Sequence, residues 1–93
     1  MYATRIKMKP GCYYSNSTVE IDEIYITGCD KEGYYKKGSV HDYVKSNPNS
    51  IRVKIGPNYP YLIPSVSVND EKYVKSQAND TPNDNLLELP RYE

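Results

Sequence analysis

The stretch 84-DNLLELPRYE-93 places three leucines in the last ten residues of a chain that is otherwise polar. Leucine, isoleucine and valine together number only eighteen of the 93 residues, and phenylalanine and tryptophan are absent. Burial of one leucine stabilises a fold by roughly 1.5–3 kcal/mol, so the three leucines carry a large share of the stability of so small a protein. We expect Leu86, Leu87 and Leu89 to insert into the core after a turn capped by Asp84 or Asn85.

Length and composition indicate one domain, residues 1–93. Twelve acidic residues balance twelve basic ones, so the chain lacks the excess of cations by which general nucleic-acid and membrane-surface binders hold their targets. Nucleic acid is therefore not the expected partner. The N-terminus has no long apolar stretch, which predicts neither a signal peptide nor a membrane span and favours a cytoplasmic protein.

The two cysteines and the one histidine fall short of the four ligands that a structural zinc site normally needs. We expect no metal and no cofactor. In a reducing cytoplasm Cys12 and Cys29 are first interpreted as free thiols, and a disulfide between them stays open as the alternative.

The first third of the chain predicts two strands. Residues 3–8 alternate apolar and charged side chains, which is typical of a strand with one buried face. Residues 19–27 are rich in β-branched side chains, but their apolar parity switches after Ile21. We therefore place a bulge near Asp22 and Glu23, where one additional residue restores the buried face. Residues 28–33 have the composition of a turn.

The rest of the chain predicts one helix and three strands. Helical spacing of apolar residues over 39–46 predicts a short helix with Ser39 as its N-cap. Alternation predicts a strand over 51–55, and residues 65–68 and 72–77 are typical of a hairpin, followed by a turn over 78–83. Residues 56–64 contain three prolines and are expected to pair only at a sheet edge. The predicted fold is α+β, a small antiparallel sheet of about five strands with one short helix packed on it.

The block 72-KYVKSQANDTPNDNLLELPR-91 resembles the closing segment of a family of small bacterial and phage proteins, one of the domain-of-unknown-function families. Members of that family end in Asp-Asn-Leu-Leu-x-Leu-Pro, which residues 84–90 match in order. A weaker likeness covers residues 4–6 and the helix around Val44. The resemblance implies a single small domain of the same fold, and it brings no activity, cofactor or catalytic residue.

Catalytic chemistry has few candidates. Neighbouring helical residues project about 100° apart, so His41 and Asp42 are not expected to act as a base and its orienting acid. We interpret His41 as a structural residue, at the surface or partly buried. Glu20 and Asp22 are expected to face Arg5 and Lys7 as cross-strand ion pairs.

The basic residues Arg5, Lys7, Arg52 and Lys54 would share one side of the sheet if the first and third strands were neighbours. Cations close to tyrosine rings suit a ligand that carries phosphate and a planar base. The alternative is an ordinary solvated face that Glu20 and Asp22 neutralise.

Tyrosine, with eleven residues, replaces the missing aromatic types. Six of these residues fall on segments predicted to be irregular, where they resemble the tyrosine-rich loops of binding proteins. Filling of the small core and a homo-oligomeric interface are the alternatives. The six are Tyr13, Tyr14, Tyr34, Tyr35, Tyr59 and Tyr61.

The sequence thus predicts a non-catalytic binding module for a protein partner or a small anionic, nucleotide-like ligand. By analogy with the phage members of the family, its sharper form is a phage-borne protein that sequesters a host component. One alternative is a small enzyme that assembles His41, Asp42 or Cys29 across an oligomer interface. The other is a structural accessory domain.

Overall fold

The computed structural model describes residues 1–55, 59–77 and 85–92, without the side chains of Asn85 and Tyr92. The elements of this part of the chain are seven strands, one α-helix and two short 3₁₀ helices. In chain order they are β1 (Tyr2–Met8), η1 (Thr18–Glu20), β2 (Ile21–Thr27), β3 (Gly33–Lys36), α1 (Lys37–Ser46), β4 (Arg52–Val53), β5 (Leu62–Val66), β6 (Lys72–Ser76), η2 (Asn85–Glu88) and β7 (Arg91–Tyr92).

The main sheet has the strand order β3-β2-β1-β4, and β7 also pairs with β1. β2 is antiparallel to both β1 and β3, whereas β4 and β7 are parallel to β1. β4 pairs at Tyr2 and Ala3 and β7 at Ile6 and Lys7, so these two short strands follow each other along one edge of β1. The predicted α+β class is confirmed. The sheet is mixed rather than wholly antiparallel, because β4 and β7 return to β1 by long connections rather than by hairpins.

The bulge predicted in β2 is present. Lys7 pairs with Glu23 and Met8 with Ile21, so Asp22 is the additional residue of β2. The extra residue resets the alternation of side chains, which keeps both Ile21 and Ile24 buried.

The helix begins earlier than predicted. Lys36, rather than Ser39, is the N-cap of α1, and it makes no side-chain capping hydrogen bond. Residues 34 and 35 belong to β3 and not to a loop, since β3 pairs with β2 directly before the helix starts. No helix in the described part of the chain combines the length and the apolar character needed to cross a membrane.

The hairpin β5–β6 forms a sheet of its own. β5 starts at Leu62, earlier than predicted, and contains Pro64, which pairs with Val74. Proline is tolerated there because both strands of a two-stranded sheet are edges. In the turn of the hairpin, the Ser67 hydroxyl accepts hydrogen bonds from the backbone N–H groups of Asn69 and Glu71, both at 3.2 Å.

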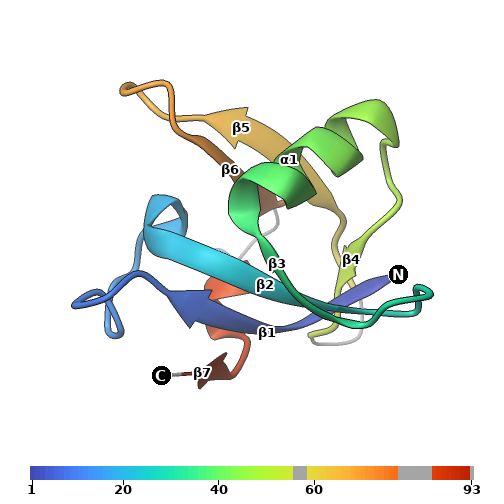
Figure 1. Cartoon of the computed structure of the whole chain (residues 1–93), viewed down its shortest axis with the longest axis horizontal. Helices are drawn as coiled ribbons and strands as arrows, with labels where there is room; N and C mark the ends of the chain where they lie inside the picture. Colours follow the sequence, from blue (N-terminus) through green and yellow to red (C-terminus); the bar gives the residue numbers. More distant parts are fainter. Residues whose placement is uncertain (56–58, 78–84, 93) are drawn as a thin grey trace.

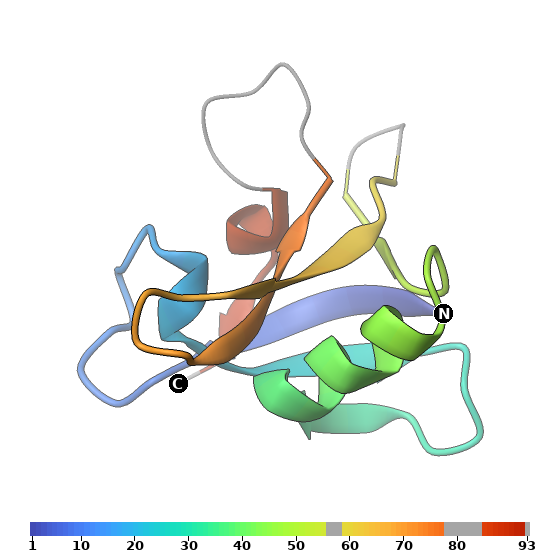
Figure 2. The ribbon, with the colours of Figure 1, turned by 90° about the horizontal axis from the view of Figure 1, so that it is seen from above.

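The two layers of the fold are visible in Figures 1 and 2, where α1 and the hairpin lie on the same side of the main sheet. We call the side of the sheet that they cover the inner face and the opposite side the outer face. α1 contacts β2, β3, β5 and β6. The core between the layers is aliphatic and consists of Ala3, Ile6, Met8, Ile21, Ile24, Ile26, Val40, Val44, Ile51, Val53, Leu62, Val74, Leu86, Leu87 and Leu89.

The leucines of the C-terminal segment are part of this core, as predicted. Leu86, Leu87 and Leu89 are 0%, 9% and 4% exposed. The backbone forms η2, and Ile6 N then donates to Pro90 O at 3.0 Å as the chain enters β7. The predicted turn over 78–83 and capping by Asp84 or by the side chain of Asn85 lie outside the described residues.

Candidate functional site

The outer face of the main sheet carries a row of tyrosine and arginine side chains. Tyr34 of β3 pairs with Tyr25 of β2, and Tyr25 pairs with Arg5 of β1. The rings of Tyr25 and Tyr34 meet edge to face with their centroids 5.0 Å apart, and the Arg5 guanidinium lies 5.8 Å from the Tyr25 centroid. Because Ile24 and Ile26 on either side of Tyr25 are buried, alternation directs this row away from the core.

A second group lies where β1 meets β4. Tyr2 pairs with Arg52, whose guanidinium lies 4.6 Å from the centroid of the Tyr61 ring. Arg52 Nη2 also donates a hydrogen bond to the Tyr61 hydroxyl at 2.9 Å. The rings of Tyr2 and Tyr59 meet edge to face at 5.8 Å. We call both groups together the tyrosine–arginine face, which consists of Tyr2, Arg5, Tyr25, Tyr34, Arg52, Tyr59 and Tyr61.

This face contains five of the ten residues predicted as a binding site and two that the prediction missed. Tyr2 and Tyr25 lie on strands, whereas the predicted tyrosines were those on segments expected to be irregular. The available signal was alternation: Tyr25 stands between two buried isoleucines, and Tyr2 precedes the buried Ala3. Lys54, two residues beyond Arg52, is exposed.

The prediction that Glu20 and Asp22 form the ion pairs with β1 is wrong. Lys7 Nζ lies 3.6 Å from Glu23, and Asp22 instead pairs with Lys36 at 3.3 Å, because the bulge changes the residue that faces β1. Glu20 ends η1 and accepts hydrogen bonds from the Cys12 thiol at 2.7 Å and the Ser15 hydroxyl at 2.8 Å. The bond to Glu20 raises the pKa of the Cys12 thiol.

The remaining predicted tyrosines lie apart from the face. Tyr13 and Tyr14 follow the other end of β1, where their rings are 4.9 Å apart and Tyr14 is 87% exposed. Tyr35 pairs with Ile24 and belongs to the inner side of β3. Adjacent strand residues point to opposite faces, so Tyr34 and Tyr35 cannot serve the same surface.

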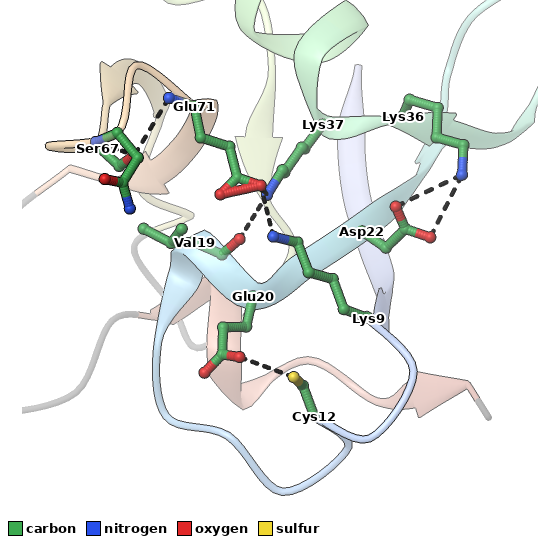
Figure 3. Close-up of polar contacts among 10 residues, drawn as sticks. Lys9, Cys12, Val19, Glu20, Asp22, Lys36, Lys37, Ser67 and Glu71 are labelled. Atoms are coloured by element: carbon green, nitrogen blue, oxygen red, sulfur yellow. Dashed lines mark hydrogen bonds and ion pairs between the residues drawn. The ribbon is translucent and has the colours of Figure 1, made fainter.

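A charged cluster joins the hairpin to the rest of the molecule (Figure 3). The Glu71 carboxylate accepts hydrogen bonds from Lys37 at 2.7 Å and from Lys9 at 2.5 Å, and Lys37 also donates to Val19 O. The bonds from Lys37 and Lys9 lower the pKa of Glu71 to about 2, whereas burial lowers the pKa of Lys37. Lys9 and Lys37 contact the same Glu71 oxygen and tie the turn of the hairpin to the end of β1 and to α1, so we interpret the cluster as a structural clamp.

His41 and Asp42 do meet, contrary to the argument from helix geometry. His41 Nδ1 lies 3.0 Å from Asp42 Oδ1, and Lys72 Nζ contacts the same oxygen at 3.1 Å. The hydrogen bond from His41, followed by that from Lys72, lowers the pKa of Asp42. His41 is 3% exposed, so it is more deeply buried than predicted. Within the described residues, no three histidine, cysteine, aspartate or glutamate side chains converge to hold a metal ion.

Comparison with known protein families matches residues 3–90 to the family described as "Protein of unknown function (DUF3892)". The chain belongs to this family. The match begins in β1 and ends after η2, so it includes every strand that contributes to the tyrosine–arginine face. The predicted membership of a family of unknown function is confirmed, while the closing motif and the bacterial or phage origin stay predictions. Neither the curated proteins nor the solved structures contain a match.

Proposed function

We propose that this protein is a non-catalytic binding module whose tyrosine–arginine face holds a partner protein that presents acidic and aromatic side chains. The observation that supports this proposal is the strand register, which gathers tyrosine and arginine on the sheet face opposite the core. Tyrosine and arginine dominate the centres of protein interfaces, because each combines a large contact area with hydrogen-bonding groups.

The side chains of the face are held in place before a partner arrives. Each of the rings of Tyr25, Tyr34, Tyr2 and Tyr59 rests against another ring. Less rotamer entropy is lost on association when the contacting side chains are already ordered.

The two arginines of the face have charge available for a partner. Among the described residues, neither Arg5 nor Arg52 forms an ion pair with a carboxylate. A guanidinium that stacks on a ring keeps N–H groups in its plane, and these bind a carboxylate through two parallel hydrogen bonds.

The test is a charge reversal on the face. We expect Arg5→Glu to lose a partner that the wild-type protein captures from an extract of its source organism. Lys45→Glu is the matched control, because Lys45 is exposed on α1. Both variants should melt close to the wild type. A partner captured equally by Arg5→Glu and wild type would contradict the proposal.

A second candidate is a small anionic ligand with a planar ring, such as a nucleotide. The arrangement that favours it is the Arg52 guanidinium over the Tyr61 ring, with the exposed Lys54 two residues on. Aromatic rings stack with bases, and cations bind phosphate. A phage-borne protein that sequesters a host nucleotide is the specific form of this candidate.

Native mass spectrometry of protein purified from its source separates the two candidates. A bound nucleotide adds a small mass, which Arg52→Ala should abolish, whereas a bound protein adds the mass of a chain. A dimer of this chain, disrupted by Arg5→Glu, would identify the face as a homo-oligomeric interface instead.

A further inference from the structure

A pocket of about 280 Å³ lies on the side of the molecule that the tyrosine–arginine face does not reach. Its walls come from α1, from the inner side of β2 and β3, and from the chain next to β1 and β4. The side chains important for its chemistry are Met1, Cys29, Tyr35, Ser39, Val40 and Tyr43. Ile26 and Ile51 of the core complete the walls.

The walls are held by backbone contacts. Arg52 N donates a hydrogen bond to Met1 O at 3.0 Å, which fixes the chain before β1. Gly28 has φ of +80°, and a Cβ added there would lie 3.3 Å from Met1 Cα. Only glycine combines this backbone conformation with so close an approach. Met1 is therefore positioned at the pocket by the turn that follows β2.

Two polar side chains of the walls have hydrogen-bond partners within the protein. The Cys29 thiol and the Tyr35 hydroxyl both donate to the carbonyl of Lys31, the thiol at 3.4 Å. Among the described residues that line the pocket, none carries a charged side chain. The walls offer a charged ligand no side chain of opposite charge, which favours an uncharged occupant.

Size and wall chemistry together define the occupant. A dry cavity of about 150 Å³ lined by aliphatic and aromatic side chains binds benzene, and this pocket has nearly twice that volume. Tyr35 and Tyr43 offer ring edges and faces to a planar molecule, and the sulfur atoms of Met1 and Cys29 make favourable contacts with aromatic rings. We propose that the pocket is a binding site for an uncharged aromatic molecule of one or two rings, with the Ser39 hydroxyl at its polar edge.

Ser39 is the place to block the site. It is the third residue of α1 and is exposed, so a larger side chain can enter the pocket there without displacing a core residue. Ser46 is the matched control, because it is also exposed and ends the same helix away from the pocket.

The experiment is a titration of the methyl-labelled protein with indole, an uncharged two-ring probe, followed by NMR. We expect saturable shifts of the methyl signals of Met1, Ile26, Val40 and Ile51 and none for Ala3. Ser39→Phe should weaken indole binding at least about tenfold, equivalent to about 1.4 kcal/mol, and Ser46→Phe should bind like the wild type.

Three outcomes would overturn the proposal. They are an absence of shifts up to the solubility of indole, equal affinity in Ser39→Phe and wild type, or equally tight binding of indole-3-acetate, which carries a carboxylate on the same ring system. Arg5→Glu should bind indole normally, so failure of this site and failure of the partner-binding face are distinguishable.

Discussion

The two faces of the main sheet carry different types of side chain. The inner face has aliphatic side chains from β1 and β2, including Ile6 and Ile24, both of which are 0% exposed. The outer face of the same strands carries tyrosine and arginine, and Tyr2 there is 36% exposed. Strand alternation thus divides a chain poor in aliphatic residues into one face that stabilises the fold and one that we propose recognises a partner.

The difference in burial predicts that substitutions on the inner face destabilise the protein more than substitutions on the outer face. Removal of a fully buried side chain loses its transfer free energy and leaves a cavity. Removal of a half-exposed ring loses a smaller area, and water can occupy the space. The following predictions test this contrast, beginning with the inner face, where the expected effects are largest.

Leu86→Ala should destabilise the protein by about 3 kcal/mol, because Leu86 is 0% exposed and lies in the core. For a protein of this size the melting temperature should fall by roughly 15 °C, measured by circular dichroism. Leu86→Met keeps most of the volume and should cost far less.

Removal of residues 85–93 should prevent folding altogether, since it deletes three buried leucines and β7. Cooperative melting of the truncated chain near the wild-type temperature would show that the inner face does not depend on the C-terminal segment.

The inner face was largely predictable from the sequence. Alternation and helical spacing identified β1, β2 and α1, and the shortage of aliphatic residues pointed to Leu86, Leu87 and Leu89. β3 was not found, because four residues that begin with glycine, continue with two adjacent tyrosines and end with one lysine carry no apolar alternation of their own. The strand predicted over 51–55 is present as the shorter β4, but its parallel pairing with β1 was not predicted, and β7 was not found. Pairings of two residues each depend on tertiary packing rather than on a local pattern.

The outer face was predictable only in part. Arg5 and Arg52 were selected because they share a face with other cations on their strands, and β1 and β4 are indeed neighbours. Their ring partners Tyr25 and Tyr61 depend on register, which a single sequence does not specify across long connections. The prediction for His41 was wrong for a local reason. Ideal helix geometry separates His41 from Asp42, but the side-chain torsions bring His41 Nδ1 within 3.0 Å of Asp42 Oδ1.

Loss of the charged clamp that holds the hairpin over the inner face should destabilise the protein less than Leu86→Ala and more than a substitution on the outer face. The pKa of Glu71 is about 2 in the folded protein, against about 4.3 in an unfolded chain. A carboxyl group whose pKa is lower in the folded protein than in the unfolded chain stabilises the fold fully at any pH above its unfolded pKa. This stabilisation is lost as the pH falls toward 2. Glu71→Gln should therefore melt below the wild type at pH 6, and the difference should shrink between pH 5 and pH 2.

Asp70→Asn is the matched control for this measurement. Asp70 is exposed in the same turn, and its φ of 60° is one that asparagine also adopts. Its melting temperature should follow that of the wild type at each pH. Equal pH profiles for Glu71→Gln and Asp70→Asn would show that the clamp does not stabilise the hairpin.

Tyr25→Thr should give the smallest change in stability. Threonine keeps the strand preference of the position, while the edge-to-face contact with Tyr34 and the contact with Arg5 are lost. A ring pair contributes about 0.5–1.5 kcal/mol to stability, and an exposed cation next to a ring contributes about 0.5–1 kcal/mol. We therefore expect the free energy of unfolding, measured with urea, to fall by roughly 1 kcal/mol. Partner binding should fall much more than stability, because Tyr25 lies at the centre of the row from Tyr34 to Arg5. A loss as large as that of Leu86→Ala would mean that the outer face is a second core, and the proposed division of labour between the two faces would then be wrong.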